Sequence, residues 1–294
     1  MALSMISWKK KTTFLGLSET ESVIMKNFSV LISVYAREQG DYLEAALRSV
    51  LEQTVPPTEI VLVKDGPLTP ELDTVIAHFC ERYTTLKIVK LARNMGLGNA
   101  LNAGLSACTY DLVARMDSDD LSLPDRFENQ LRVFDEHPDV SVVGGWISEF
   151  DNNSKDVISY RKLPQTDKEL KRICQLKNPF NHMTVMFYKR DVLDAGGYQH
   201  FYLFEDYWLW MRMIKNGVKF YNVQDVLVNV RGGTAMAARR GGWKYVKSEI
   251  RFQKQIWQMG LISLHVFLRN VCIRFSIRMI PNGLRSLIYK KVLR

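Results

Sequence analysis

Residues 111–120 read DLVARMDSDD, an apolar segment that runs directly into a cluster of carboxylates. Asp111 to Met116 has the composition of a buried β-strand. Asp117 and Asp119, two residues apart at its end, can hold a divalent cation, because Mg²⁺ and Mn²⁺ prefer oxygen ligands and often bridge carboxylates to phosphates. The alternative is an acidic turn that caps the helix predicted to start at Pro124. The position after a buried strand favours the metal site.

Strands and helices alternate on the N-terminal side of this segment. Short runs rich in β-branched residues predict strands over Phe28–Val34, Glu59–Val63 and Leu86–Leu91. Apolar residues at helical spacing predict helices from about Asp41 to Leu51, Pro70 to Tyr83 and Gly98 to Ala107, and again from Pro124 to His137. This alternation is typical of a mostly parallel sheet with helices on both faces.

Each predicted strand of this half is followed by a polar loop. These loops are Ser33–Glu38, Lys64–Gly66, Arg93–Asn102 and Asp117–Asp120. Because the carboxyl ends of parallel strands lie at one edge of the sheet, the loops should face one another there, where open α/β sheets bind ligands. The pattern favours a nucleotide-binding crevice at this edge. A plain turn at Asp65-Gly66 and a simple helix start at Gly98 are the alternatives for two of the loops.

The second half is mixed. We expect it to extend the sheet, with strands over Val140–Gly144, Trp146–Phe150, Met183–Tyr188 and Val226–Val230. Glu205 and Asp206 open a predicted helix that ends at Lys215. An acid there can act as a general base, although acids are also favoured at helix N-termini by the helix dipole. His182 is a weaker candidate for contact with a ligand, since a lone histidine is more often structural.

The charge of the chain is uneven. Residues 239–294 contain 13 Lys or Arg and one acid, whereas the rest carries 27 Lys or Arg and 30 acids. Arginines interrupt the apolar segment 261–280, which makes it a poor membrane span and a good interfacial helix. A helix packed on the body, or a nucleic-acid-binding tail, are the alternatives. The cysteines lie far apart, so we expect four free thiols: Cys80, Cys108, Cys174 and Cys272.

Several stretches, in this order, resemble the family-2 glycosyltransferases of the bacterial surface-polysaccharide type. They are SVLISVYARE (29–38), SVLEQT (49–54), EIVLVKDGP (59–67), LARNMGLGNALNAGL (91–105), ARMDSDD (114–120) and EDYWLWMRM (205–213), with the Asn181-His182 strand and the Gly-Gly-Tyr turn at 196–198. The resemblance covers about residues 28–230. It implies an α/β GT-A nucleotide-sugar-binding fold with a mostly parallel central sheet and a basic α-helical C-terminal tail. It departs from the family pattern at Lys64, where an acid is usual, which puts a base contact by that side chain in doubt.

The resemblance also implies roles for individual residues. Asp119 would bind Mn²⁺ or Mg²⁺ together with Asp117, and Asp206 would be the catalytic base with Glu205 as its partner. His182 would touch donor or acceptor. The remaining residues would bind the nucleotide-sugar: Ser33, Tyr35, Arg37, Glu38, Asp65, Arg93, Gly96, Asn102, Asp117 and Ser118.

The function implied is inverting transfer of a sugar from a nucleotide-diphosphate donor, with UDP favoured, to a hydroxyl of a glycan or polyprenyl-diphosphate-linked acceptor. The enzyme would act at the inner face of the cytoplasmic membrane, peripherally bound through residues 239–294, with no nucleic acid partner. The domain division implied is an N-terminal extension (1–27) without regular structure, a GT-A domain (28–234) and a basic helical region (235–294). A nucleotidyltransferase, an inactive nucleotide-sugar-binding scaffold and an anion-binding protein remain the alternatives.

Overall fold

The computed structural model describes residues 26–232 and 243–279, and the N-terminal extension predicted at 1–27 lies almost wholly outside them. Nine strands form one sheet in the order β3-β2-β1-β4-β8-β6-β9-β5, with β7 paired to β6. The strands are β1 (Ser29–Val34), β2 (Glu59–Lys64), β3 (Leu86–Lys90), β4 (Leu112–Asp117), β5 (Leu121–Ser122), β6 (Val142–Phe150), β7 (Ser159–Arg161), β8 (Met186–Tyr188) and β9 (Phe220–Arg231). The helices are α1 (Gly40–Leu51), α2 (Pro70–Arg82), α3 (Leu97–Ala107), α4 (Arg126–Glu136), α5 (Asp167–Ile173), the 3₁₀ turn η1 (His182–Thr184), α6 (Lys189–Asp194), α7 (Glu205–Lys215), α9 (Trp243–Gln258) and α10 (Leu264–Met279).

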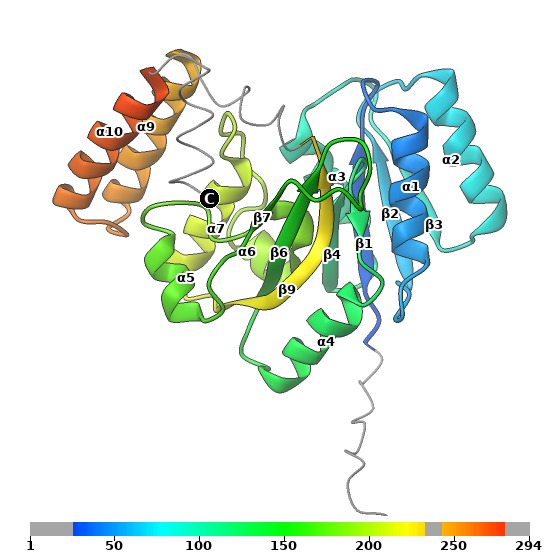
Figure 1. Cartoon of the computed structure of the whole chain (residues 1–294), viewed down its shortest axis with the longest axis horizontal. Helices are drawn as coiled ribbons and strands as arrows, with labels where there is room; N and C mark the ends of the chain where they lie inside the picture. Colours follow the sequence, from blue (N-terminus) through cyan, green and yellow to red (C-terminus); the bar gives the residue numbers. More distant parts are fainter. Residues whose placement is uncertain (1–25, 233–242, 280–294) are drawn as a thin grey trace, which may run out of the picture.

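The first four strands form the parallel half of the sheet. β1 pairs in parallel with both β2 and β4, and β2 pairs with β3. Side chains alternate between two cores: Leu31 packs with α3 and α7, while Val30 and Ile32 pack with α1, α2 and α4. The predicted parallel sheet with helices on both faces is therefore confirmed (Figure 1).

The other strands complete a mixed sheet. β8 runs antiparallel to β4 and to β6, and β6 runs parallel to β9. The two strands predicted on either side of Gly145 are one strand, β6, whose register against β9 is irregular at Gly145 and Trp146. The first residues of the strand predicted from Met183 belong instead to η1.

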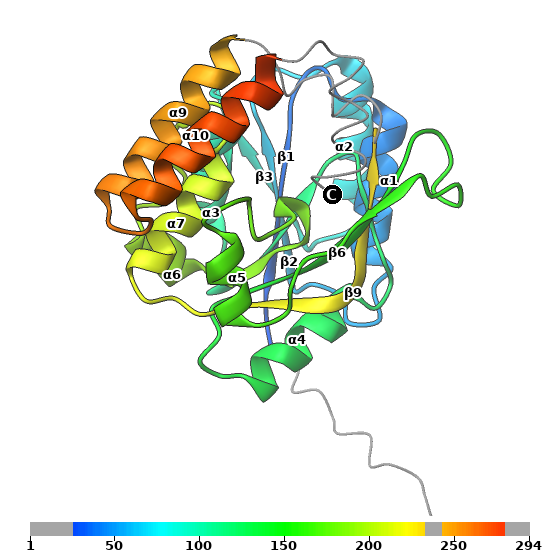
Figure 2. The ribbon, with the colours of Figure 1, turned by 60° about the vertical axis from the view of Figure 1, so that its left-hand side comes forward.

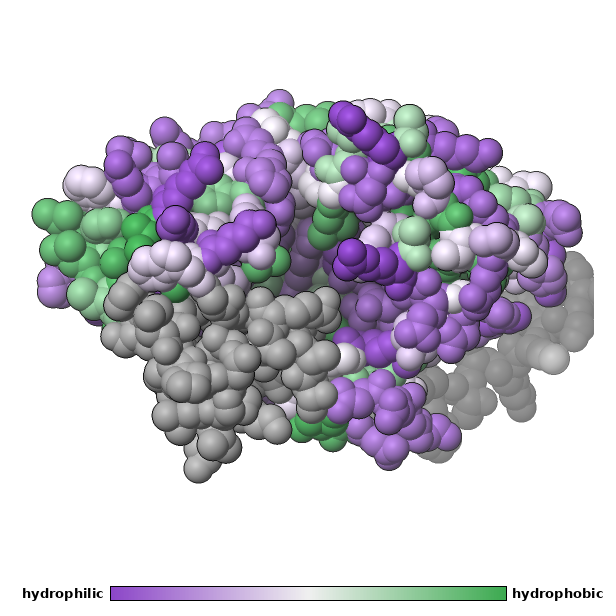
Figure 3. Space-filling view, turned by 90° about the horizontal axis from the view of Figure 1, so that it is seen from above, coloured by the Kyte–Doolittle hydropathy of each residue, from purple (hydrophilic) through white to green (hydrophobic). Residues whose placement is uncertain are grey.

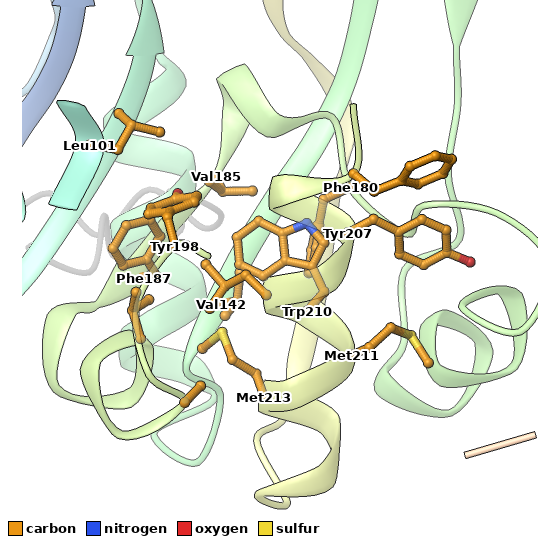
Figure 4. Close-up of a cluster of buried hydrophobic side chains, with 14 of the residues drawn as sticks. Leu101, Val142, Phe180, Val185, Phe187, Tyr198, Tyr207, Trp210, Met211 and Met213 are labelled. Atoms are coloured by element: carbon orange, nitrogen blue, oxygen red, sulfur yellow. The ribbon is translucent and has the colours of Figure 1, made fainter. Parts of the chain in front are cut away.

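The C-terminal helices α9 and α10 lie side by side along α7 (Figures 1 and 2). Phe252 of α9 stacks on Phe204 with ring centroids 5.1 Å apart and lies 4.4 Å from Tyr207. The same hydrophobic cluster contains Trp210, the large side chain at the centre of Figure 4. The helical pair thus shares its core with the rest of the protein.

The arginines that interrupt segment 261–280 would lie on the outer, basic face of the predicted interfacial helix, and this expectation was wrong for Arg274. The Arg274 guanidinium points inward, 2.7 Å from the carboxylate of Glu249, which is 3% exposed. Arg269 is exposed, and the side chain of Arg278 lies outside the described residues. The outer face of α10 instead carries Leu264, Leu268 and Ile273, each about half exposed. None of the helices described is both long and apolar enough to cross a bilayer.

Candidate functional site

The predicted polar loops gather at the carboxyl ends of β1, β2 and β4. Figure 3 looks onto this edge of the sheet and shows a hollow near its centre. Two pockets lie there, one on each side of the loop that leads into α3. The first is lined by the loops that follow β1, β2 and β3, and the second by α3, η1, the start of α7 and the loop residue Tyr198.

An acidic cluster follows β4. Asp117, Asp119 and Asp120 each offer a carboxylate oxygen within 4.8 Å of the others. Asp117 is held by the buried guanidinium of Arg115, and Asp120 accepts a hydrogen bond from the backbone N–H of Arg231 at 2.9 Å. Within the described part of the chain, no side chain donates a hydrogen bond to the Asp119 carboxylate.

Burial, together with the negative charges of Asp117 and Glu38, raises the pKa of Asp119 to about 7. Burial and the other two acids also raise the pKa of Asp120. Three carboxylates held this close repel one another, and a divalent cation relieves that repulsion while using the oxygen ligands it prefers. The donor set therefore fits Mg²⁺ or Mn²⁺, with Asp119 the carboxylate most available as a ligand.

Arg115 is a residue of this site that we did not predict. It lies on β4 two residues before Asp117, is 2% exposed, and its Nε and Nη1 have no hydrogen-bond partner in the described structure. The signal in the sequence is a charged residue inside the apolar run LVARM. A buried arginine is costly without partners, so its place beneath the acidic cluster indicates a functional constraint.

The first pocket is a cleft of about 340 Å³. Its lining is Tyr35, Ala36, Arg37, Asp65, Gly66, Pro67 and Asn94. The Glu38 carboxylate, next in the chain to Arg37, accepts a 2.7 Å hydrogen bond from Ser118 Oγ and so joins the loop after β1 to the acidic cluster. Ser33 pairs with Asp117 across neighbouring strands. The exposed Tyr35 ring offers a stacking surface for a base.

Asp65 anchors the loop between the two pockets. Its carboxylate accepts hydrogen bonds from the backbone N–H groups of Met95, at 2.6 Å, and Gly96, at 3.1 Å. Gly96 has φ of 82°, a conformation that favours glycine. Arg93 is exposed on the same loop. Asp65 therefore fixes the conformation of the loop that borders the cleft.

Asn102, which was expected to contact the donor, binds the backbone of Tyr198. Its side-chain amide donates to the backbone carbonyl of Tyr198 at 2.7 Å and accepts from the Tyr198 N–H at 2.8 Å. Both functions of the amide are therefore used to tie α3 to the glycine turn at Gly196-Gly197. Asn102 supports the wall of the second pocket through Tyr198.

The second pocket contains the candidate base. Its lining is Leu97, Gly98, Leu101, His182, Tyr198, Glu205 and Asp206. His182 Nε2 lies 2.9 Å from the Tyr198 hydroxyl, and burial followed by the charge of Arg115 holds the pKa of His182 well below its usual value. His182 is accordingly neutral. Burial also raises the pKa of Glu205.

Asp206 is oriented by a residue outside the predicted set. The Asn178 side-chain amide donates a 2.6 Å hydrogen bond to Asp206 Oδ2. Asn178 lies in the segment between α5 and η1, and its own carbonyl accepts from Arg161 at 2.9 Å. The contact fixes one carboxylate oxygen and leaves the other for a substrate proton.

The chain is similar to known proteins over most of its length. The model of the Glycosyl transferase family 2 matches residues 29–197, more than half of the chain. The chain belongs to this family. This glycosyltransferase is 40% identical, over 91% of its length and 96% of the relative, to the UDP-Gal:alpha-D-GlcNAc-diphosphoundecaprenol beta-1,3-galactosyltransferase of Escherichia coli. It is 42% identical, over 90% of its length and 98% of the relative, to the amylovoran biosynthesis glycosyltransferase AmsE of Erwinia amylovora.

A solved structure supports the fold. S. aureus TarS in complex with UDP-GlcNAc superposes with a TM-score of 0.64 at 19% identity, over 92% of this chain and 76% of that one. The predicted family and GT-A fold are thereby confirmed. The reading of the chain as a nucleotidyltransferase or a nucleic-acid-binding protein is not supported.

Proposed function

We propose that this glycosyltransferase transfers a hexose from a UDP-sugar to a hydroxyl of a sugar carried on a lipid diphosphate, with inversion, in surface-polysaccharide synthesis. The observation that carries the proposal is the pair of pockets on either side of residues 94–97, one beside the acidic cluster and the other containing Asp206. The names of the two relatives, a UDP-Gal-dependent transferase acting on a lipid diphosphate and an amylovoran enzyme, support these substrate classes.

Nucleotide binding, metal binding and proton transfer are assigned to different residues of the site. The first pocket takes the nucleoside, with Tyr35 against the base and the loop held by Asp65 along its side. Asp119 and Asp117 would hold the metal, and Mn²⁺ or Mg²⁺ bound there would act as a Lewis acid that neutralises charge on the leaving diphosphate. Asp206, oriented by Asn178, accepts the proton of the acceptor hydroxyl as that oxygen attacks the anomeric carbon. Attack from the face opposite the leaving group inverts the configuration.

The proposal is tested with the purified full-length protein and a panel of UDP-, GDP- and dTDP-sugars. A donor that binds the native state raises the melting temperature by mass action. We expect a metal-dependent increase with a UDP-sugar, lost in Asp119→Ala, and a product of inverted anomeric configuration by NMR. Donor binding without transfer to any lipid-diphosphate acceptor would favour the inactive scaffold. The absence of any donor response would contradict the proposal.

We also propose that α10 attaches the enzyme peripherally to the anionic inner face of the cytoplasmic membrane. Leu264, Leu268 and Ile273 are each about half exposed on α10, Arg269 is exposed on the same helix, and no acid occurs in the sequence after Glu249. Figure 3 shows apolar surface at the end of the molecule where α9 and α10 lie. An apolar face with basic neighbours is typical of a helix that lies in a lipid interface.

Liposome flotation tests the attachment. Because α9 and α10 share a core with α7, removing them would damage the fold, so point variants are the better probe. We expect Leu264→Gln/Leu268→Gln to lose binding to anionic vesicles, whereas the exposed Leu193→Gln on α6 retains it. Equal flotation of both variants would contradict membrane attachment through α10.

A further inference from the structure

Tyr198 is a polar residue of the second pocket, which it lines together with Asp206. It is 3% exposed, and its hydroxyl lies 2.9 Å from His182 Nε2. A tyrosine hydroxyl can donate one hydrogen bond and can also accept, and the imidazole uses one of these positions. Among the residues that the structure describes, no second partner hydrogen-bonds this hydroxyl. It therefore keeps hydrogen-bonding capacity for a ligand in the pocket.

The backbone of Tyr198 is fixed by side chains from two separate helices. Asn102 of α3 accepts a hydrogen bond from its N–H at 2.8 Å and donates to its carbonyl at 2.7 Å. Arg212 of α7 donates to the carbonyls of Ala195 and, at 2.7 Å, of Gly197. Gly197 has φ of 63°, and a Cβ there would lie 2.8 Å from Asn102 Oδ1, so this turn favours glycine. Such rigid support is expected of a side chain that must hold a ligand in one position.

Tyr198 lies between the acidic cluster and the proposed base. Its partner His182 belongs to η1, and the backbone N–H of Arg115 on β4 donates at 2.8 Å to the residue that follows η1. The Arg115 guanidinium in turn pairs with Asp117. Burial raises the pKa of Tyr198, and the charge of Arg115 lowers it. The charges of Asp206 and Asp117 raise it further, so carboxylates from both sides act on this one hydroxyl.

In the proposed reaction, the transferred sugar occupies the same space. The acceptor oxygen attacks its anomeric carbon from the side of Asp206, while its diphosphate leaves from the side of Asp117 and Asp119. The sugar ring therefore lies between the two sets of carboxylates, beside Tyr198. Because Tyr198 stays protonated and His182 is neutral, the pair offers hydrogen bonds without charge. Uncharged partners suit a sugar hydroxyl, whereas a phosphate is bound best by cations.

We propose that the Tyr198 hydroxyl, held by His182, binds one hydroxyl of the transferred sugar and thereby selects the donor sugar. This inference rests on the proposed function and names a residue that distinguishes one UDP-hexose from another. A site built to pair a substrate hydroxyl discriminates strongly, because an analogue without that hydroxyl leaves buried polar groups of the site unpaired.

The test is a cycle that removes the hydroxyl from the enzyme and from the sugar separately. The full-length protein is assayed with the UDP-sugar that it uses best and with UDP-sugars that each lack one hydroxyl. For the wild type, we expect kcat/KM to fall about 10- to 100-fold with one of these deoxy donors, as for an unpaired buried group. Tyr198→Phe should lose a similar factor with the intact donor and use that deoxy donor within about threefold as well, because the two hydroxyls form one interaction. Its affinity for UDP alone stays unchanged.

Tyr207→Phe is the matched control. Tyr207 is also 3% exposed, and its hydroxyl donates a hydrogen bond to the backbone carbonyl of Cys174, outside the lining of the pocket. The variant therefore loses one buried tyrosine hydroxyl without changing the second pocket. Any loss of activity in Tyr207→Phe should be the same factor for the intact and the deoxy donors.

Several outcomes overturn the inference. An equal loss with every donor in Tyr198→Phe shows that the hydroxyl only supports the fold, and unchanged kinetics shows that it does not bind the sugar. A loss confined to the KM of the acceptor assigns the hydroxyl to the acceptor sugar instead. In these cases transfer from a UDP-sugar by the wild type is unaffected. A wild-type enzyme that uses no UDP-sugar overturns the proposed donor class, and the inference with it.

Discussion

Asn178 Nδ2 lies 2.6 Å from Asp206 Oδ2, so a neutral amide holds the carboxylate that we propose as the base. An amide donor orients the group without adding charge beside it. The interaction joins the loop before η1 to the first turn of α7, two segments 28 residues apart. The reactive geometry therefore depends on the packing of the second half of the chain as much as on the Asp206 position itself.

Replacing Asn178 by Asp tests this relationship. A second carboxylate within hydrogen-bond distance disfavours the charged form of Asp206 and raises its pKa. We expect the acid limb of the kcat profile to move to higher pH and activity at neutral pH to fall. Asn178→Ala removes the donor without adding a charge, so it lowers kcat about tenfold with a smaller shift of the profile in the same direction, and Asp206→Asn lowers kcat about 10²- to 10⁴-fold. If the Asn178→Asp enzyme has the wild-type pH profile, Asn178 does not interact with the catalytic carboxylate of Asp206.

The acidic cluster predicts a pH-dependent stability. The pKa of Asp119 is raised to about 7 in the folded protein, against 3.8 for an unperturbed Asp. A carboxyl group with a raised folded pKa contributes stability at low pH that is lost as the pH rises through the folded value. We expect the melting temperature of the metal-free protein to fall between about pH 4 and pH 7, and Mn²⁺ to restore it at pH 7.5 and above.

The variant Asp119→Asn separates the contribution of Asp119 from the contributions of the other acids in the cluster. The variant removes one of the three charges, so its metal-free form should be more stable than wild type at neutral pH. It should also lose most of the response to Mn²⁺ and to donor. A variant that keeps the full metal response, measured by thermal denaturation with and without EDTA, would show that Asp119 is not a ligand.

Asp65 provides a test of the loop that separates the pockets. Its two oxygens accept the N–H groups of Met95 and Gly96, and an amide in its place offers only one acceptor and faces those donors with its own N–H₂ group. We expect Asp65→Asn to raise the donor KM about tenfold, as for the loss of one charged hydrogen bond. The kcat at saturating donor changes little, and amide hydrogen exchange of residues 95–96 becomes faster. Unchanged donor KM and exchange would show that the loop is held by other contacts.

The parallel half of the sheet was predicted well because its strands and helices can be recognised from local runs of apolar residues. The strand Glu59–Lys64 is buried on both faces, so it reads as one apolar run between polar ends. The helix Glu205–Lys215 was also predicted at its observed limits, since its apolar residues recur at helical spacing between acidic and basic ends. The acids that follow β4 come together because the sheet brings strand ends to one edge.

Other features depend on partners distant in sequence. Two strands were predicted, one on each side of Gly145, but β6 continues through this residue, and a Cβ on the preceding Gly144 would collide with Asn222 Oδ1 of β9. Asn102 suggested a donor contact, yet its amide is used by the backbone of Tyr198, 96 residues away. The role of Asn178 likewise follows from tertiary packing. No periodicity or local motif contains such information.

The buried pair of Glu249 and Arg274 gives the last prediction. Glu249 is 3% and Arg274 18% exposed, so each charge is largely removed from water and is balanced by the other. Glu249→Gln leaves the guanidinium without its carboxylate, and we expect a loss of about 3–5 kcal/mol in the free energy of unfolding. Glu249→Gln/Arg274→Met removes both charges and should recover most of that loss, as is common when buried pairs are replaced together.

A surface pair is the control. Arg48 and Glu44 are exposed on α1, and Arg48→Met should leave the melting temperature nearly unchanged, since exposed pairs contribute little. Because Arg274 also holds the Leu176 carbonyl, two residues before the Asn178 that orients Asp206, Glu249→Gln should lower kcat even well below its melting temperature. Denaturant unfolding and acceptor kinetics on the same preparations check both effects. If the single and double variants are equally destabilised, the contribution of α9 and α10 is apolar packing around Phe252, and the ion pair has no separate part in it.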